Sequence, residues 1–449
     1  MISKENLAAL AQKFPLQDVE EPNLYRQSFS YSKLPQVEFD GQDVPMAPAP
    51  DMWITDTTFR DGQQSRPPYT VEQIVQIYKL MAELDNGTGL IRQSEFFLYT
   101  PKDREAIDKC RNLGYKFPQI TGWIRAVKSD FARVKEMGLE ETGILTSASD
   151  YHIFLKLRKS RKQAMEQYLD VVKASLDAGI KPRCHFEDIT RADFHGFVVP
   201  FAIELMKLSQ QYKMPIKVRM CDTMGFAVPW PQAALPRSVA KLTRGLIEEA
   251  GVPGELLEWH GHNDFHKVLI NPATAWLYGC AACNGSLLGI GERTGNTPIE
   301  AMVIEAGQLQ GHSSKINYPV ITEIARYYQK ELGHDIPSNY PLVGRDFNVT
   351  KAGIHADGLL KNEEIYNCFD TQTLLNRPVG VAITDKTGAA GIKHWIEHHY
   401  EIKVAKDDSR LITIKDRVDA EYEAGRTSCI SDDEMILWYH EVFDAGEAE

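Results

Sequence analysis

The segments that decide the fold begin with WITD at residues 53–56 and end with CNGSLLGIG at residues 283–291. Between them, short apolar runs alternate with longer stretches in which apolar residues recur every three or four positions. VEQIVQIYKLMAEL (71–84) and RKQAMEQYLDVVKASLDAG (161–179) are two of these amphipathic stretches. The strand–helix alternation repeats eight times, so the chain is predicted to be an α/β protein.

The predicted strands are residues 53–56, 90–97, 118–124, 142–146, 181–187, 216–222, 256–260 and 283–291. Gly114, Gly138, Gly179 and Gly279 fall near predicted helix ends, where a left-handed cap favours glycine. Eight such units within about 260 residues predict a closed (β/α)₈ TIM barrel. An open doubly wound sheet is the alternative, but it usually has fewer units, and no GxGxxG opens the first turn.

Two flanking segments differ in composition from the predicted barrel, which we place at residues 51–315. Residues 1–50 are rich in Pro, Gln and aromatic residues and predict an extended N-terminal arm packed on a surface. After residue 315 the strand–helix alternation stops, and ITEIARYYQKELG and TGAAGIKHWIEHHYEI are helical patterns. We therefore expect a mostly helical C-terminal appendage over residues 316–449.

Composition narrows the classes of partner and the compartment. The 449-residue chain has a formal net charge of −12, which argues against a broad nucleic-acid-binding surface. No apolar run approaches the roughly 20 residues that span a membrane, and the N-terminus carries acids, unlike a signal peptide. Seven cysteines, an odd number spread along the chain, do not suggest a disulfide framework, so a reduced cytoplasmic location is predicted. Cys280 and Cys283 form a CxxC that we interpret as packing thiols, redox or metal chemistry being the alternative.

Polar side chains gather where the predicted strands end. In a TIM barrel, the carboxyl ends of the strands meet at one mouth, where functional residues lie. Stability alone does not explain so many ionisable groups at one mouth. In chain order these residues are Asp56, Arg60, Asp61, Gln64, Glu95, His185, Glu187, Asp188, Asp222, Thr223, His260, His262, Asn263, Asp264, Glu292, Arg293 and Asn296.

The most specific signal at this mouth is a predicted metal site. His260 and His262 are two residues apart at a strand end, so both side chains can point the same way. Two imidazoles and a carboxylate commonly bind a divalent metal and leave positions open for substrate. Asp61 is the natural carboxylate and Asn296 a further oxygen donor. The alternative is that the two histidines only cap the strand through hydrogen bonds.

The predicted ligands are nitrogen and oxygen donors without a thiolate. This set suits Mn²⁺ best, with Mg²⁺, Co²⁺ or Zn²⁺ as alternatives. A divalent ion there would chelate the keto oxygen and the adjacent carboxylate of a 2-oxo acid and polarise the carbonyl carbon.

Six motifs, in order along the chain, carry a family resemblance. They are DTTFRDGQQS (56–65), EDITRAD (187–193), DTMGFAVP (222–229), HGHND (260–264), GIGERTGN (289–296) and KAGIHADGLLK (351–361). The chain resembles the 2-isopropylmalate synthase and homocitrate synthase family of metal-dependent barrels from about residue 51 to 395. In that family the GxGERxGN loop marks the acyl-CoA-condensing synthases, whereas related lyases carry a catalytic Cys in a different loop. The resemblance therefore implies an acyltransferase.

The resemblance also implies a role for individual residues. Asp61, His260, His262 and Asn296 would be the metal ligands, with Asn296 bound directly or through water. Arg60 would stabilise the negative charge that develops on oxygen. The 2-oxo-acid pocket would be lined by Glu187, which also positions or shuttles a proton, and by Thr223.

The resemblance extends to the appendage through His355. This residue matches the family's general base, which removes a methyl proton from acetyl-CoA. In the family that histidine typically comes from the partner subunit, so a homodimer with exchanged C-terminal segments is implied. The alternative is a loop histidine packed within the appendage.

The identity of the 2-oxo acid depends on where the chain departs from the isopropylmalate enzymes. His185 replaces a small Ser ahead of Glu187, and Gly143 aligns with a His on the inner face of strand four. His185 would provide a cation for a second carboxylate, with Gln64 and Arg191 as further contacts. The C-terminal sequence is also too short for the full allosteric domain of the leucine-pathway enzymes.

The potential cation at His185 and the short C-terminal sequence both favour a dicarboxylic substrate. Among the branches of the family, the chain is most similar to the Re-type citrate synthases, which join acetyl-CoA to oxaloacetate. Homocitrate synthase, which uses 2-oxoglutarate, is the next alternative, followed by isopropylmalate and citramalate synthases. A barrel that serves only as a regulatory binding module is a further alternative, against which the intact ligand set argues. The basic run KLRKSRK (156–162) is interpreted either as a contact for CoA phosphates or as a solvated surface.

Overall fold

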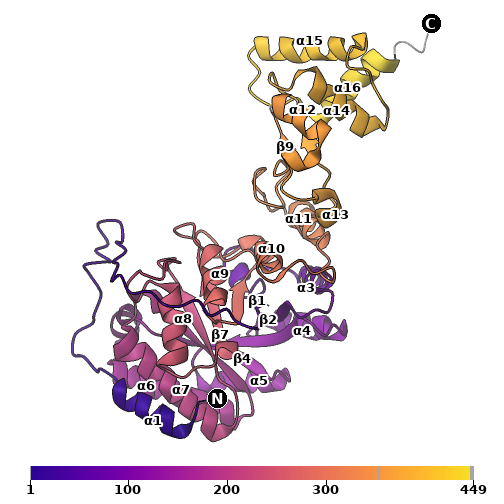
Figure 1. Cartoon of the computed structure of the whole chain (residues 1–449). Helices are drawn as coiled ribbons and strands as arrows, with labels where there is room; N and C mark the ends of the chain where they lie inside the picture. Colours follow the sequence, from indigo (N-terminus) through magenta and orange to yellow (C-terminus); the bar gives the residue numbers. More distant parts are fainter. Residues whose placement is uncertain (1, 352, 445–449) are drawn as a thin grey trace. The chain divides into compact units, whose positions relative to one another are not determined.

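The computed structural model describes residues 2–351 and 353–444 and divides into two compact units, Met1–Asn317 and Tyr318–Glu449. Each unit is described by itself (Figure 1).

The first unit is a closed barrel of eight parallel strands in sequence order, as predicted. Closure comes from β1, which pairs with β2 on one side and with β8 on the other. An open doubly wound sheet is therefore excluded. The strands are β1 (Trp53–Asp56), β2 (Ile91–Phe97), β3 (Gln119–Ile124), β4 (Glu141–Ser147), β5 (Lys181–Glu187), β6 (Lys217–Asp222), β7 (Leu257–Gly261) and β8 (Ala282–Gly285).

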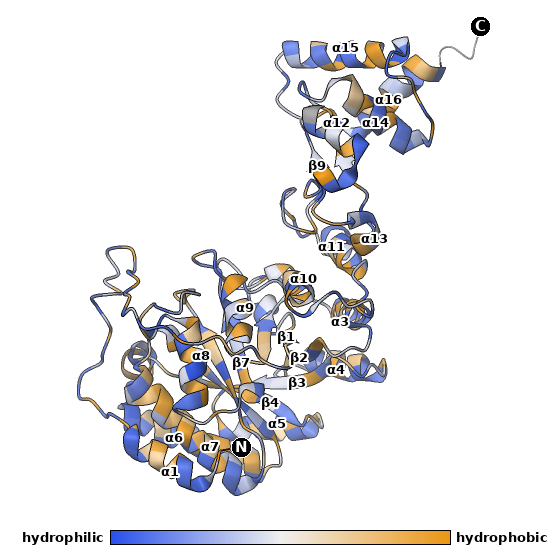
Figure 2. Ribbon diagram, in the orientation of Figure 1, coloured by the Kyte–Doolittle hydropathy of each residue, from blue (hydrophilic) through white to orange (hydrophobic). Residues whose placement is uncertain are grey.

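Helices surround the barrel, and their ribbons carry hydrophobic and hydrophilic faces (Figure 2). Two of the longest begin with capping boxes, in which Thr70 pairs with Gln73 and Ser160 with Gln163. The helices of this unit are α1 (Lys4–Lys13), α2 (Asp61–Gln64), α3 (Val71–Asp85), α4 (Pro101–Asn112), α5 (Phe131–Glu136), α6 (Arg161–Asp177), α7 (Val199–Tyr212), α8 (Val239–Glu248), α9 (Ile270–Leu277) and α10 (Ile299–Gln310).

The last strand is shorter than the sequence predicts. β8 ends at Gly285, and the chain then turns through the 3₁₀ segment Leu287–Gly289, in which Leu288 has φ 56° and Gly289 φ 62°. Positive φ is incompatible with a strand, so residues 286–291 form a loop above the barrel mouth. The prediction of a strand over 283–291 is therefore wrong beyond Gly285.

The N-terminal segment is not extended throughout, contrary to the prediction for residues 1–50. Helix α1 starts at Lys4, where the Ser3 side chain accepts a hydrogen bond from the backbone N–H of Asn6, and it packs against α7. The following residues run without regular structure along the barrel wall. They are attached to it by bonds such as the 2.9 Å bond from the Gln17 N–H to the Gly196 carbonyl.

The second unit is mostly helical, as predicted. Buried apolar side chains of three helices, including Ile396, Ile414 and Met435, form its core. Its helices are α11 (Val320–Lys330), α12 (Gly353–Lys361), α13 (Thr371–Leu375), α14 (Gly388–Tyr400), α15 (Ser409–Glu423) and α16 (Asp432–Phe443), and its strands are β9 (Val349–Thr350) and β10 (Gly380–Val381).

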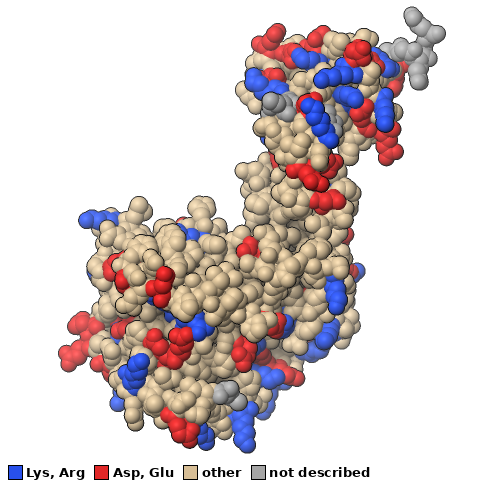
Figure 3. Space-filling view, viewed as in Figure 1, with Lys and Arg blue, Asp and Glu red and all other residues tan. Residues whose placement is uncertain are grey.

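Three further features bear on the expectations from composition. None of the helices in the described ranges is long and apolar enough to cross a membrane. The seven cysteines are all free thiols. On the face seen in Figure 3, acidic and basic side chains are interspersed rather than gathered into one basic area.

Candidate metal centre at the barrel mouth

Asp61, His260 and His262 meet at the carboxyl end of the barrel. One ligand atom from each residue lies within 4.8 Å of the others, and all three residues are buried. Within residues 2–351 and 353–444, this is the one group of three or more His, Cys, Asp or Glu side chains with such spacing. The structure thus brings together three of the four ligands that the sequence predicts.

The His260 ring is oriented by a partner that the sequence analysis missed. Its Nδ1 lies 2.7 Å from Oδ1 of Asn284, whose Nδ2 in turn donates to the Thr55 hydroxyl at 2.8 Å. Because the amide nitrogen of Asn284 is used by Thr55, its oxygen must accept the Nδ1–H of His260. The lone pair of His260 is then on Nε2, 3.5 Å from Oδ2 of Asp61.

Asn296 lies beside the same carboxylate. Its Nδ2 donates to Oδ2 of Asp61 at 3.0 Å, while its Oδ1 is buried without a hydrogen-bond partner in the described structure. Nδ1 of His262 is likewise buried and unpartnered. Buried polar atoms without partners are costly, and a bound cation would satisfy them. A Cβ at residue 291 would lie 1.8 Å from Oδ1 of Asn296, which explains why the loop has Gly291 there.

Both imidazoles are neutral, as metal binding requires. Burial, then the neighbouring His262 and Arg219, hold the pKa of His260 well below its ordinary value. Burial and then Arg293 lower the pKa of His262 to about 4. The donor set therefore fits a divalent cation without prior loss of a proton from either ring.

Arg60 lies next to the cluster, where it forms an ion pair with Asp61. Its Nε donates to Oε1 of Glu95 at 3.1 Å, and its guanidinium lies over the Trp123 ring at 5.3 Å. The residue is only 9% exposed. A fixed, desolvated cation in this position can stabilise negative charge that develops on a bound ligand.

Glu95 joins the centre to a charged layer inside the barrel. Its carboxylate accepts hydrogen bonds from Arg60, from Arg183 at 2.9 Å and from Arg219 at 3.0 Å. Arg219 also donates to Glu258 at 3.0 Å. Although burial would raise the pKa of Glu95, Arg219, Arg183 and Arg60 hold it well below its ordinary value. The carboxylate thus remains charged and fixes Arg60.

Glu187 and Thr223 also lie at the mouth. Glu187 lies at the end of β5 and pairs in register with Cys221 on β6, which in turn pairs with His260 on β7. Glu187 and His260 are therefore at the same level of the barrel. The Thr223 hydroxyl accepts a 2.8 Å bond from the Asp188 N–H, which ties the loops after β5 and β6 together. Both side chains are partly exposed.

His185 is placed as predicted but does not have the predicted charge. It lies one layer below Glu187, facing Glu95 at 3.5 Å, with 1% exposure. Burial and then Arg219 lower the pKa of His185 to about 3, so it is not the cation that the sequence argument assumed. Gly143 does face the interior: a Cβ there would lie 2.6 Å from Nε2 of His185 and 2.9 Å from Oε2 of Glu95.

The other two predicted substrate contacts differ in their freedom to bind. Gln64 is exposed at the last position of α2. Arg191 is held by Asp188, to which its Nε donates at 3.0 Å, and it stacks over the Tyr151 ring at 3.9 Å. Arg191 therefore has a structural role whether or not a ligand is present.

His355 belongs to the second unit, on α12. Its exposed ring lies 4.5 Å from the ring of Tyr366, centroid to centroid. This contact does not test whether His355 acts as a base, so that role stays a prediction.

The basic run and the cysteine pair can also be placed. Arg161 is fully buried and bonded to Asp150 at 2.6 Å, so this part of the run is structural rather than a phosphate contact. Lys156 instead approaches Glu187 at 3.3 Å. Cys280 and Cys283 are both buried, and burial raises the pKa of each thiol, which fits inert packing residues.

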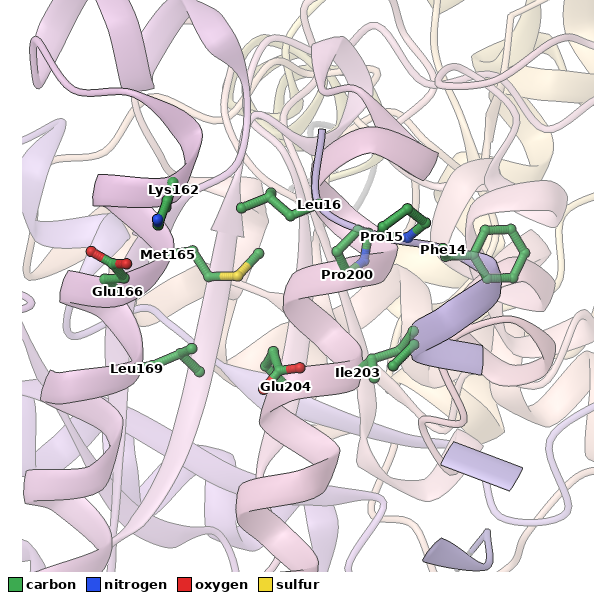
Figure 4. A pocket seen from close by; sticks show the side chains of 11 residues that line it. Phe14, Pro15, Leu16, Lys162, Met165, Glu166, Leu169, Pro200, Ile203 and Glu204 are labelled. Atoms are coloured by element: carbon green, nitrogen blue, oxygen red, sulfur yellow. The ribbon is translucent and has the colours of Figure 1, made fainter. Parts of the chain in front are cut away.

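A separate cavity of about 330 Å³ lies on the outer wall of the barrel between α1, α6 and α7 (Figure 4). Its lining is mainly apolar, with Met165, Leu169 and Ile203 among the residues that face it. The polar side chains around it are Lys162, Glu166 and Glu204. None of the predicted site residues lines it, so it is not part of the candidate metal centre.

Comparison with known proteins shows the family of the chain. Residues 51–327 match the HMGL-like family. The chain is 57% identical to a citrate (Re)-synthase of Syntrophus aciditrophicus over 94% of this chain and 68% of that one. It is 53% identical to a citrate (Re)-synthase of Clostridium kluyveri over 94% of both chains.

More distant similarities appear in sequence and in structure. A 2-phosphinomethylmalate synthase of Streptomyces hygroscopicus is 35% identical over 94% of this chain and 96% of its own length. Among solved structures, the HMG-CoA lyase of Bacillus subtilis superposes with a TM-score of 0.51 at 19% identity, covering 65% of this chain and 97% of that one. The last comparison shows the barrel fold alone. The chain thus belongs to the HMGL-like family and, within it, groups by sequence with the citrate (Re)-synthases.

Proposed function

We propose that the protein condenses acetyl-CoA with oxaloacetate to give citrate and free CoA, as a citrate (Re)-synthase. The structural observation that carries the proposal is the buried cluster of Asp61, His260 and His262 beside Arg60. The two citrate (Re)-synthases, at 57% and 53% identity over 94% of the chain, supply the substrate class.

A divalent cation fits this cluster, and we propose Mn²⁺, with Mg²⁺, Co²⁺ and Zn²⁺ as alternatives for nitrogen and oxygen donors. When bound, such an ion would polarise the keto group of oxaloacetate. Asn296 would add its unpartnered Oδ1, directly or through water.

The reaction forms one carbon–carbon bond and breaks one thioester bond. The methyl group of acetyl-CoA loses a proton and attacks the keto carbon of oxaloacetate, whose oxygen gains negative charge and then a proton. Water then cleaves the citryl thioester and releases CoA. Arg60, held by Glu95, would face the developing charge on oxygen, and Glu187 and Thr223 would line the oxo-acid pocket.

His355 is the proposed base for the methyl proton, contributed to the site by the partner subunit of a homodimer. Support comes from the KAGIHADGLLK motif and from the exposure of the ring on α12. Histidine is the side chain that most often serves as a general base in such proton transfers.

A His355→Ala variant tests both the reaction and the base. Metal-loaded wild-type protein should release CoA from acetyl-CoA only when oxaloacetate is present. The variant should keep metal and oxaloacetate binding, measured by calorimetry, and lose about 10²–10³-fold in kcat, because one proton transfer is no longer assisted. Unchanged turnover would remove His355 as the base.

The origin of His355 can be tested by mixing subunits. If each site combines Asp61 of one chain with His355 of its partner, a dimer of one His355→Ala chain and one Asp61→Asn chain has one site with both residues intact. Its other site lacks both residues. After equimolar subunit exchange, about a quarter of the wild-type activity should return. If His355 acts within its own chain, the mixture should stay as inactive as its components.

A further inference from the structure

Outside the metal cluster, one histidine at the barrel mouth contacts a proposed site residue. His152 follows β4 on the π-helix Tyr151–Lys156, and its Nδ1 lies 3.1 Å from Oε2 of Glu187. Its Nε2 lies 3.7 Å from Oδ2 of Asp188. The side chains of His152 and Glu187 are each 17% exposed, so this contact is largely shielded from water.

We propose that His152 is a positioning residue that fixes the Glu187 carboxylate, in its ionised form, toward the substrate pocket. The inference rests on the proposed function and extends it, because it assigns the group that controls a residue lining the pocket.

The contacts of Glu187 divide between its two oxygens. Oε2 accepts from the Ser147 hydroxyl and faces Nδ1 of His152, while Lys156 approaches both oxygens at 3.3 and 3.4 Å. Ser147, His152 and Lys156 all contact Oε2, and Lys156 also lies 3.3 Å from Nδ1 of His152, so these groups together restrict the orientation of the carboxylate. Among the described residues, Oε1 then has only the contact with Lys156, so its other side is free to accept a hydrogen bond from a ligand.

His152 is itself held by the segment that carries it. Asp150, just before the π-helix, accepts two hydrogen bonds from the buried Arg161 at 2.9 and 2.6 Å. The Tyr151 hydroxyl donates to the Leu24 carbonyl at 2.7 Å. π-Helical turns often occur at functional sites, where they redirect a side chain, and here the turn aims His152 at Glu187. The N-terminal segment thus braces the barrel mouth.

The electrostatics agree with this geometry. Burial alone would raise the pKa of Glu187, but His152, then Ser147 and Lys156, lower it to about 2. Tyr168 from α6, Cys221 from β6 and the adjacent Asp188 are further titratable groups near Glu187. Without His152, burial would dominate, so the pKa of Glu187 should rise by about one unit or more. The carboxylate would then become protonated at a higher pH than in the wild type.

The test compares His152→Ala with His152→Asn, whose amide N–H occupies a position close to that of Nδ1–H. His152→Ala should lower kcat about 10–100-fold with KM for acetyl-CoA nearly unchanged, and shift the acidic limb of the rate profile upward by about one pH unit. His152→Asn should restore most of kcat and of the profile. His195→Ala is the matched control, because His195 pairs with Glu249 at 2.8 Å on the outer wall and should change neither.

A second measurement needs no turnover. The carboxylate band of Glu187, isolated by difference infrared spectroscopy against Glu187→Gln, should titrate at higher pH in His152→Ala than in the wild type. Lys156→Met, at an exposed position, should give a smaller shift in the same direction and keeps the test valid if His152→Ala does not fold. A wild-type titration curve in every variant would overturn the inference. If instead the band shifts but oxaloacetate is not consumed by the wild type, the proposed function fails and the role of His152 stands.

Discussion

An Asp61→Asn variant should lose about 10³-fold or more in CoA release from acetyl-CoA and oxaloacetate. The substitution preserves shape but removes the one negative charge among the three clustered ligands, so the affinity for a divalent cation should fall with it. A loss of about 4 kcal/mol of transition-state stabilisation corresponds to this factor. Metal content after dialysis, measured by elemental analysis, and the rate with saturating Mn²⁺ check both expectations.

The control is Asp85→Asn. Asp85 is also fully buried, but it accepts hydrogen bonds from backbone N–H groups of Gly89 and Ile91 in the turn before β2, at the opposite end of the barrel. This variant should lose stability yet retain metal and turnover per folded molecule. An Asp61→Asn protein that binds metal and turns over as the wild type does would contradict the assigned ligand set.

A Glu95→Gln variant should lower the free energy of unfolding by about 3–5 kcal/mol, which is the cost of leaving buried charges without their partner. Glu95 is 1% exposed and bonded to Arg60, Arg183 and Arg219. Glutamine fills the same volume but cannot neutralise three guanidinium groups. Urea unfolding followed by tryptophan fluorescence measures the change, and the rate should also fall because Arg60 is released.

Glu140→Gln is the comparison for an exposed ion pair. Glu140 pairs with Lys181 at 2.9 Å, but its side chain is 83% exposed. Solvent screening limits such a pair to about 1 kcal/mol or less. Equal losses for the two variants would mean that the interior network adds nothing beyond surface electrostatics.

Repeated strand and helix periodicity was sufficient to predict the barrel, because each strand is a short apolar run bounded by turns. The end of β8 could not be predicted in the same way. Leu287, Leu288 and Ile290 continue an apolar pattern, although Leu288 and Gly289 adopt positive φ and turn the chain away from the sheet. Asn284, the partner of His260, carries no motif in the sequence, because its role depends on the register that pairs it with His260 across β7 and β8.

The predicted metal ligands were recoverable from spacing, since residues at the ends of parallel strands share one mouth. The charge of His185 was not recoverable, because its pKa depends on burial and on Arg219, which lies on the neighbouring strand. His152 was missed for a related reason. Its approach to Glu187 depends on a π-turn and on the arm from residues 17–24, neither of which has a periodic signature.

Because His185 is neutral, it does not supply a cation for the second carboxylate of oxaloacetate. The proposal of oxaloacetate as the substrate therefore rests on the similarity to the citrate (Re)-synthases. The most direct test is to supply metal-loaded protein and acetyl-CoA with oxaloacetate, 2-oxoglutarate, pyruvate or the branched oxo acid of isopropylmalate synthesis, and to measure CoA release. Oxaloacetate should give citrate with kcat/KM at least about tenfold above the others. A preference for 2-oxoglutarate, or CoA release that survives complete removal of the metal, would contradict the account.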